Sequence, residues 1–205
     1  MTNKNPSFKQ EQKLWNNELN YIAGVDEVGR GAFAGPLVAA AVILPKNFKR
    51  KGIRDSKLLT PDLRETLSKY VIENALFYSI SEVNVHFINQ FGVGEATQKA
   101  FRKCLKNLKQ SFDFVLVDGF KIKGFDDNRQ KAIIHGDNLS ISIAAASIIA
   151  KVYRDNLMRK LHKNFPEYNF YANKGYGTKF HRAALKQYGL SNEHRTSFNL
   201  SKFLE

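Results

Sequence analysis

The chain has 205 residues, 43% hydrophobic and 25% charged, which is typical of one globular domain. Its 32 lysines and arginines exceed its 19 aspartates and glutamates, and the net charge of +13 predicts a polyanionic partner, either nucleic acid or an anionic membrane surface. Cys104 is the one cysteine, which excludes an intrachain disulfide framework and a multi-cysteine zinc site.

The sequence predicts neither a membrane span nor a secretory signal. The longest purely apolar run, Leu37–Leu44, is far shorter than the roughly 18 residues that a spanning helix needs. The first twenty residues are mostly polar and contain no hydrophobic signal region. We therefore expect a cytoplasmic protein in a reducing compartment.

The first expected elements follow a polar segment. Met1–Lys13 predicts a loose arm, and the whole arm is placed at residues 1–20. The apolar run Tyr21–Asp26 predicts a strand, and the continuous apolar run Leu37–Leu44 predicts a buried strand. A helix is expected to begin after Thr60, a suitable N-cap, with Pro61 at its first position.

Strands and helices alternate through the middle of the chain, and residues 156–205 are basic and aromatic. This order predicts an α/β domain over residues 21–205, with a mixed sheet and a helical C-terminal extension over about 156–205. The expected elements are a strand at Ala75–Val83, an amphipathic helix at Gly94–Lys109, a strand at Phe112–Val117, a short strand at Lys131–His135 and a helix capped by Asn138 or Ser140.

Carboxylates stand at three of the expected strand ends. Asp26 and Glu27 end the first strand, Asp118 follows Phe112–Val117, and Asp137 follows the short strand before a helix. In open α/β sheets the carboxyl ends of the strands form the binding crevice. Carboxylates that lie close together repel one another unless divalent cations neutralise them, and hard oxygen ligands select Mg²⁺ or Mn²⁺. Two such ions can hold the attacking water and the leaving oxygen of a phosphoryl displacement.

Two difficulties accompany this interpretation. Asp26 and Glu27 would point to opposite faces of a regular strand, so we expect the strand to end, bulge or twist there, helped by Gly29 and Gly31. An aspartate before glycine is also a common turn former, and Asp137 could simply cap the next helix. The pattern by itself leaves turn-forming aspartates and a metal-dependent nuclease both open.

Six motifs resemble bacterial ribonuclease HII. Gly24–Gly31, with the sequence GVDEVGRG, and the following Ala34–Val42 resemble the signature of that family. Further segments resemble its other motifs in the family's order, and the resemblance runs from Tyr21 to Phe198. They are Asp55–Leu58, Val117–Gly119, Gly136–Asp137 with Ala144–Asp155, Gly175–Thr178 with His181, and His194–Phe198.

The resemblance implies a ribonuclease H-like fold, a mixed sheet flanked by helices. It implies an endonuclease that hydrolyses the RNA strand of RNA–DNA hybrids and incises 5′ to ribonucleotides embedded in duplex DNA, leaving 5′-phosphate and 3′-hydroxyl ends. It also implies two Mg²⁺ or Mn²⁺ ions in catalysis. We expect nucleic-acid partners, no membrane contact and a monomer. The acids that match the family's metal-binding positions are Asp26, Glu27, Asp118 and Asp137.

The resemblance further implies substrate contacts. Gly29, Arg30 and Gly31 match a loop that senses the ribose 2′-hydroxyl, largely through backbone groups, and only a hydroxyl that donates and accepts distinguishes RNA from DNA there. Ala32 and Phe33 follow where many members carry proline, so the junction preference could differ. Tyr176 matches the residue that stacks on the next sugar, and Ser56 and Lys57 match positions near the substrate phosphates.

Two alternatives remain at this stage. A ribonuclease HIII-like enzyme would cleave all-RNA hybrid strands and act weakly on a single ribonucleotide, so comparing the two substrates discriminates it. A hybrid-binding module without catalysis would bind but not cleave in Mg²⁺ or Mn²⁺, although intact acids at all four positions argue against it.

Overall fold

A computed structural model of the protein describes residues 5–49, 52–53 and 59–204. Its centre is a five-stranded mixed sheet with the strand order β3-β2-β1-β4-β5. β1 pairs antiparallel with β2, and β2 antiparallel with β3, whereas β1–β4 and β4–β5 are parallel pairs. The strands are β1 Ile22–Val28, β2 Leu37–Ile43, β3 Phe77–Val83, β4 Phe114–Asp118 and β5 Gln130–Ile133.

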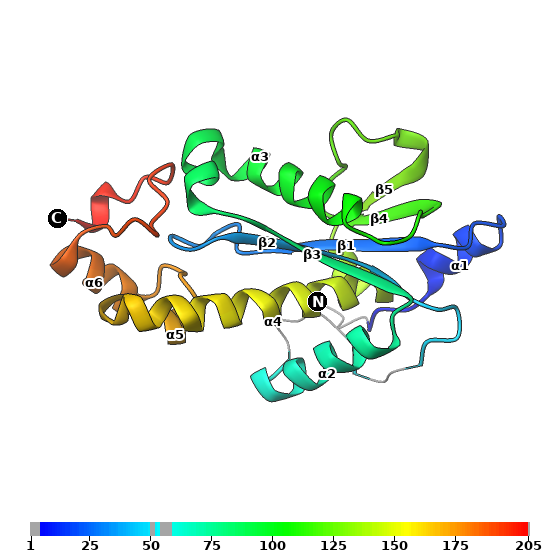
Figure 1. The fold of residues 1–205 in the computed structure, drawn as a ribbon, viewed down its shortest axis with the longest axis horizontal. Helices are drawn as coiled ribbons and strands as arrows, with labels where there is room; N and C mark the ends of the chain where they lie inside the picture. The colour runs from blue at the N-terminus through cyan, green and yellow to red at the C-terminus, as the bar shows by residue number, and fades with distance from the viewer. Residues whose placement is uncertain (1–4, 50–51, 54–58, 205) are drawn as a thin grey trace.

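Helices cover both faces of this sheet. Figure 1 shows α3 over one face and α2 with α4 over the other, while α6 and the C-terminus lie beyond one end of the sheet. This arrangement confirms the expected α/β architecture with a mixed, helix-flanked sheet. The helices are α1 Lys9–Trp15, α2 Pro61–Asn74, α3 Val85–Lys106, α4 Ile141–Asn164, α5 Phe170–Asn173 and α6 Lys179–Tyr188.

The interior strand β2, between β3 and β1, is buried on both faces, which explains its continuous apolar run. Alternate residues face α3 on one side and α4 on the other, so two separate hydrophobic clusters form. Small residues allow α4 to approach the sheet closely. A Cβ at Gly24 in β1 would lie 2.2 Å from the carbonyl carbon of Ser142, so only glycine fits there.

Several expected boundaries are confirmed and one is wrong. Thr60 accepts a hydrogen bond from the Leu63 backbone as the N-cap of α2, and Ser140 is the cap of α4. The helix expected from Gly94 instead begins at Val85. Its first turns precede a break at Gly92, where φ is 79°, and this interruption hid the helical periodicity.

The N-terminal segment is more ordered than a loose arm. α1 packs on the body through Glu11, which is fully buried. Glu11 Oε1 accepts hydrogen bonds from Ser140 Oγ at 2.5 Å and from the Ser142 backbone N–H at 3.0 Å. A buried carboxylate at the start of α4 also interacts favourably with the helix dipole. The division at about residue 156 stays a prediction, and α4 runs on across it to Asn164.

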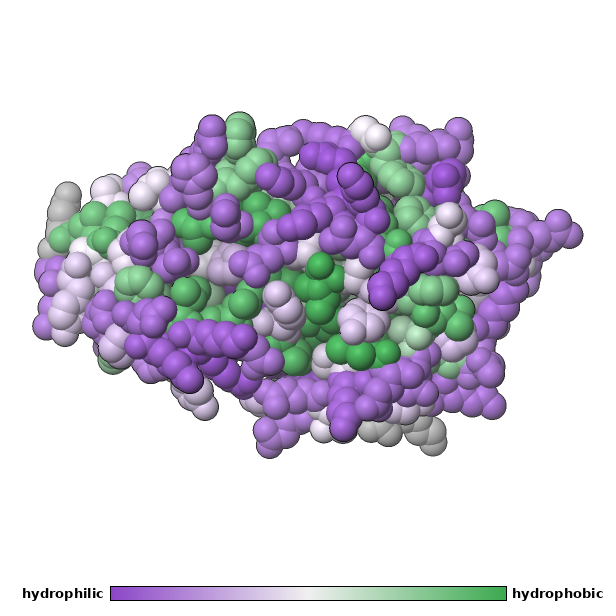
Figure 2. Space-filling model, viewed as in Figure 1, coloured by the Kyte–Doolittle hydropathy of each residue, from purple (hydrophilic) through white to green (hydrophobic). Residues whose placement is uncertain are grey.

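Among the described helices, none is long and apolar enough to cross a bilayer. In Figure 2 hydrophobic residues gather along the middle of the face where Figure 1 shows the edge strand β3, with hydrophilic residues on both sides. Tyr78 of β3 and the preceding Leu76 are among the exposed large hydrophobic residues.

Candidate acidic centre and substrate loops

Asp26 and Asp118 end up on neighbouring parallel strands at the same level. In the pairing of β1 with β4, Val25 lies opposite Val117, and each aspartate is the next residue along its strand. β5 pairs with β4 with Ile133 opposite Asp118, and Asp137 follows in the 3₁₀ turn Gly136–Asn138. The carboxyl ends of three parallel strands thus bring these acids to one edge of the sheet, as expected for this topology.

The electrostatics of Asp26 reflect this gathering. Its side chain is buried, and desolvation raises the pKa of the Asp26 carboxyl well above its usual value. The negative charges of Glu27, Asp118 and Asp137 raise this pKa further, whereas a hydrogen bond with Ser147 of α4 lowers it. The other three acids therefore interact electrostatically with Asp26, although Asp118 and Asp137 are far from it in the sequence.

The expected end or bulge of the strand at Asp26 and Glu27 is wrong, whereas the expected twist stays a prediction. β1 continues in regular register through both residues, with Asp26 opposite Ala40 and Glu27 opposite Ala39. Pairing with β2 keeps the strand in register as far as Val28, and the chain leaves the extended conformation at Gly29, where φ is 96°. Neighbouring strand residues point to opposite faces, and Glu27 Oε1 lies 3.7 Å from Arg30 Nη1.

Backbone and amide groups orient the other two acids. Asp118 Oδ1 accepts a hydrogen bond from the Gly136 N–H at 2.6 Å, and Asp137 Oδ1 accepts one from Asn138 Nδ2 at 3.0 Å. Asp137 is not the cap of α4, because Ser140 fills that position. The alternative that Asp137 is simply a capping residue is therefore wrong.

The donor set fits a hard divalent cation. Carboxylate oxygens are the ligands that Mg²⁺ and Mn²⁺ prefer, and a cation would relieve the repulsion that raises the Asp26 pKa. Within the described part of the chain, no three histidine, cysteine, aspartate or glutamate side chains stand close enough to ligate one ion together. Glu27, Asp118 and Asp137 thus lie within electrostatic range of Asp26 without forming a closed set of ligands.

The loop after β1 is held from beneath by Arg195, which is fully buried. Arg195 Nη1 donates to the carbonyl oxygens of Gly29 at 2.6 Å and Arg30 at 3.0 Å. Its Nε and Nη2 donate to the Gly35 carbonyl at 3.0 and 2.8 Å. The Arg30 side chain is 45% exposed and stacks over the Phe120 ring at 4.9 Å, so its guanidinium can reach solvent or a phosphate.

A second buried arginine, Arg154 of α4, joins this loop to the loop that carries Tyr176. Its Nη2 donates to the Ala34 carbonyl at 3.1 Å and its Nη1 to the Lys174 carbonyl at 2.8 Å. The Phe33 N–H donates to the Gly175 carbonyl at 2.8 Å. The structure therefore brings the Gly29–Gly31 loop and Tyr176 together.

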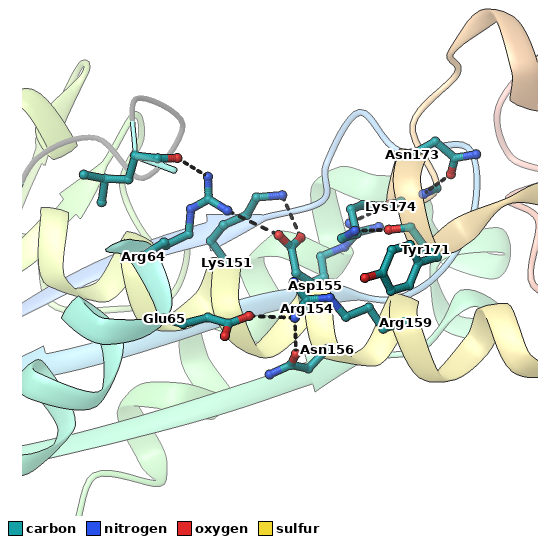
Figure 3. Close-up of polar contacts among 12 residues, drawn as sticks. Arg64, Glu65, Lys151, Arg154, Asp155, Asn156, Arg159, Tyr171, Asn173 and Lys174 are labelled. Carbon is teal, nitrogen blue, oxygen red and sulfur yellow. Dashed lines mark hydrogen bonds and ion pairs between the residues drawn. The ribbon is translucent and has the colours of Figure 1, made fainter. Parts of the chain in front are cut away.

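The Tyr176 ring is half-buried and lies beside two cations of α4. Arg154 Cζ is 5.4 Å and Lys151 Nζ 5.9 Å from the ring centroid. Lys151 also pairs with Asp155 at 2.7 Å, and Asp155 lies 3.5 Å from Arg64 of α2, as Figure 3 shows. Asp155 thus pairs with these two cations rather than with Arg154.

Ser56 and Lys57 lie outside the described residues. The chain beside them is anchored, because Arg64 Nη2 donates to the Leu59 carbonyl at 2.8 Å. Sequence reasoning missed Ser147 and the clamping roles of Arg154 and Arg195. Ser147 had a signal, since it is the one polar residue within Ala144–Ala150. The two arginines had none, because their carbonyl partners come from remote loops.

Comparisons with known proteins identify the family of this chain. The family model described as Ribonuclease HII matches residues 23–201. A curated "Ribonuclease HII" from Ehrlichia chaffeensis is 48% identical over 198 residues, covering 94% of each chain.

Two solved structures share the fold. The ribonuclease H2 from Pyrococcus horikoshii has a TM-score of 0.74 at 28% identity, covering 90% of this chain and 99% of that one. Bst-RNase HIII in complex with Mn²⁺ has a TM-score of 0.66 at 18% identity, covering 90% and 68% of the two chains. The family match and the identity over nearly the full chain show that this chain belongs to the ribonuclease HII family, endonucleases that act on RNA–DNA hybrids.

Proposed function

We propose that this ribonuclease incises duplex DNA on the 5′ side of an embedded ribonucleotide, leaving 5′-phosphate and 3′-hydroxyl ends, besides hydrolysing the RNA strand of hybrids. Asp26, Glu27, Asp118 and Asp137 would hold two divalent cations, Mg²⁺ or Mn²⁺. The observation that carries the proposal is the placement of Asp26 and Asp118 at the same level near the carboxyl ends of β1 and β4, with Asp137 close by.

The metal site would supply activation of the attacking water and stabilisation of the departing 3′-oxygen. The protein's own part is to orient the acids and to oppose part of the rise in the Asp26 pKa. Ser147 lowers the pKa of Asp26 by hydrogen bonding, and the Gly136 N–H fixes the Asp118 carboxylate. No side-chain nucleophile is needed, and the buried edge of the sheet limits the water that reaches the acids.

Recognition of the ribonucleotide would fall to the two joined loops. Arg195 donates to the carbonyls of Gly29 and Arg30, which fixes the orientation of these two peptide groups. The N–H groups of the same peptide planes, those of Arg30 and Gly31, would thereby be oriented for a ligand. Arg30 would grip a phosphate as a planar fork. The Tyr176 ring would pack on the sugar that follows the ribonucleotide, where a deoxyribose fits and a 2′-hydroxyl does not. Ser56 and Lys57 would approach the phosphates.

Cleavage of a DNA duplex with one ribonucleotide tests this proposal. With Mg²⁺ or Mn²⁺ we expect one incision 5′ to the ribonucleotide, with 5′-phosphate and 3′-hydroxyl ends, and none in the presence of a chelator. An all-RNA hybrid serves as the matched substrate. Cleavage of the hybrid alone would indicate a ribonuclease HIII-like specificity, and binding without incision in both ions would indicate a silent binding module.

A further inference from the structure

Two buried histidines face each other behind the Tyr176 loop. His181 lies in the first turn of α6, and His194 lies in the segment that bridges to Ala34. Their relative exposures are 0% and 1%, and the two Nε2 atoms are 3.0 Å apart. The proposed reaction assigns neither residue a role, although both belong to motifs that the sequence analysis singled out.

The surrounding hydrogen bonds determine which nitrogen of each ring carries the proton. The Ser191 backbone N–H donates to His194 Nδ1 at 2.9 Å, so Nδ1 is bare and a neutral His194 carries its proton on Nε2. The Tyr176 carbonyl lies 3.0 Å from His181 Nδ1, which must therefore be the protonated nitrogen of that ring. His181 Nε2 then accepts from His194 Nε2–H, and all four ring nitrogens are satisfied.

The environment keeps the pair neutral. The rings of Tyr168 and Phe170 pack against both histidines, with the Tyr168 centroid 4.7 Å from that of His194. Burial lowers the pKa of His181 and lowers that of His194 to about 4. A further proton would set two N–H groups against each other across 3.0 Å. At neutral pH the hydrogen bonds therefore run in one direction, each group donating to the next, from the Ser191 N–H to His194, from His194 to His181 and from His181 to the Tyr176 carbonyl. We call this chain of hydrogen bonds the relay.

The relay ends on the backbone of Tyr176. The Tyr176 carbonyl accepts from His181, and its N–H donates to the Asn173 carbonyl at 2.9 Å. At the other end, His194 is followed by Arg195, which clamps the carbonyls of Gly29 and Arg30. One short segment thus holds both loops of the proposed recognition site.

We propose that His181 and His194 are positioning residues that set the place of Tyr176 relative to the Gly29–Gly31 loop and so determine selectivity for a lone ribonucleotide. This inference rests on the proposed function of Tyr176. The histidines act through the backbone and touch no substrate. Their loss would move the ring that reads the junction while leaving the acidic edge of the sheet in place.

The test compares two replacements of His181. His181→Asn places an amide N–H near the position of Nδ1 and keeps the donor to the Tyr176 carbonyl, whereas His181→Leu removes it. For His181→Leu we expect kcat/KM on a duplex with one ribonucleotide, relative to an all-RNA hybrid, to fall about tenfold. His181→Asn should restore most of that ratio. In Tyr176→Ala the further change His181→Leu should lower the ratio no more.

Tyr168→Phe is the matched control. It removes a hydrogen bond from the same cluster, between the Tyr168 hydroxyl and the Gly189 carbonyl, without touching the relay. Its substrate ratio should equal that of the wild type. A ratio in His181→Leu equal to that of Tyr168→Phe would overturn the proposal. If His181→Leu does not fold, the same substrate ratio is compared between His181→Asn and His194→Leu. A lower ratio in His194→Leu supports the proposal, and equal ratios overturn it.

Ring-nitrogen NMR shifts give a second readout that simple packing would not produce. We expect a protonated Nδ1 on His181 and a protonated Nε2 on His194 in the wild type, and the opposite tautomers would contradict the relay. Failure of the underlying function is distinguishable. It would appear as no lone-ribonucleotide incision by the wild type, or as an unchanged ratio in Tyr176→Ala.

Discussion

The Nε atom of Arg154 occupies the space that a side chain at Gly29 would need. A Cβ built on Gly29 would lie 2.2 Å from it, and Gly29 has a φ of 96°. Glycine at this position is therefore required by the internal packing of Arg154 as well as by any substrate that approaches the loop. The Gly29 loop and the buried Arg154 guanidinium therefore pack directly against each other.

This relationship makes Gly29→Ala a sensitive probe. The methyl group must displace Arg154 and strain the backbone, so we expect a loss of about 2 kcal/mol or more in the free energy of unfolding. Cleavage of both substrates should fall steeply, because both loops depend on Arg154. Urea unfolding and cleavage rates measure the two effects. Gly31→Ala is the control for the unfolding measurement, since a Cβ there meets nothing within 4 Å. Equal stability of the two variants would contradict the packing.

Asp26→Asn should abolish cleavage and stabilise the metal-free protein. The change removes a buried charge that three other acids repel, while an amide oxygen can still accept the hydrogen bond from the Glu27 N–H. We expect a gain of about 1 kcal/mol in unfolding free energy at pH 7 with chelator present. Duplex affinity should stay close to that of the wild type. Glu95→Gln, on the exposed face of α3, is a matched carboxylate control. Wild-type cleavage by Asp26→Asn would refute its role as a ligand.

Acid should destabilise the protein partly through His194. Its pKa is lowered from 6.5 to about 4 in the folded state, so above pH 6.5 neither state takes up the proton. As the pH falls from 6.5 towards 4, the unfolded chain is protonated first and stability is lost, by up to about 3 kcal/mol. The pKa of the neighbouring His181 ring is also lowered by burial, so His181 contributes a loss of stability in acid in the same direction.

Urea unfolding of wild type and His194→Gln at pH 7, 6 and 5 isolates this contribution. We expect the variant to have the lower free energy of unfolding at pH 7. The difference in unfolding free energy between the two proteins should narrow as the pH falls, because the unfolded variant has no His194 to take up a proton. A gap that stays constant across the range would show that His194 is not held neutral by the fold.

Duplex affinity should fall steeply with salt, because contacts between a chain of net charge +13 and phosphates release counterions. If Arg30 grips a phosphate, Arg30→Ala should lower the slope of log affinity against log salt by about one. Arg102→Ala is the control, because its side chain lies on the exposed face of α3 and donates to the Lys123 carbonyl. Equal slopes for the wild type and Arg30→Ala would contradict a contact between Arg30 and a phosphate.

Local patterns were sufficient to predict the strands, the caps and the carboxylates near the carboxyl ends of β1, β4 and β5. The apolar run of β2, the Thr60 and Ser140 caps and these carboxylates are each encoded within a few residues. Where a local break interrupts the periodicity, as at Gly92 in α3, the same reasoning fails. It also allowed an end or a bulge at Asp26–Glu27, because the pairing with β2 that keeps this strand in regular register cannot be read from β1 itself.

Only the tertiary structure decided how the two recognition loops are held. The carbonyls of Gly29, Ala34, Lys174 and Tyr176 are satisfied by Arg195, Arg154 and His181, which are remote from them or belong to other elements. A charged residue in a sequence usually predicts a position on the protein surface. An arginine side chain can be buried stably only when the folded backbone supplies enough hydrogen-bond acceptors for its N–H groups. The sequence by itself determined which acids and loops the chain carries. The tertiary fold brought the hydrogen-bond donors to those loops, because a hydrogen bond depends on position in space and not on distance along the chain.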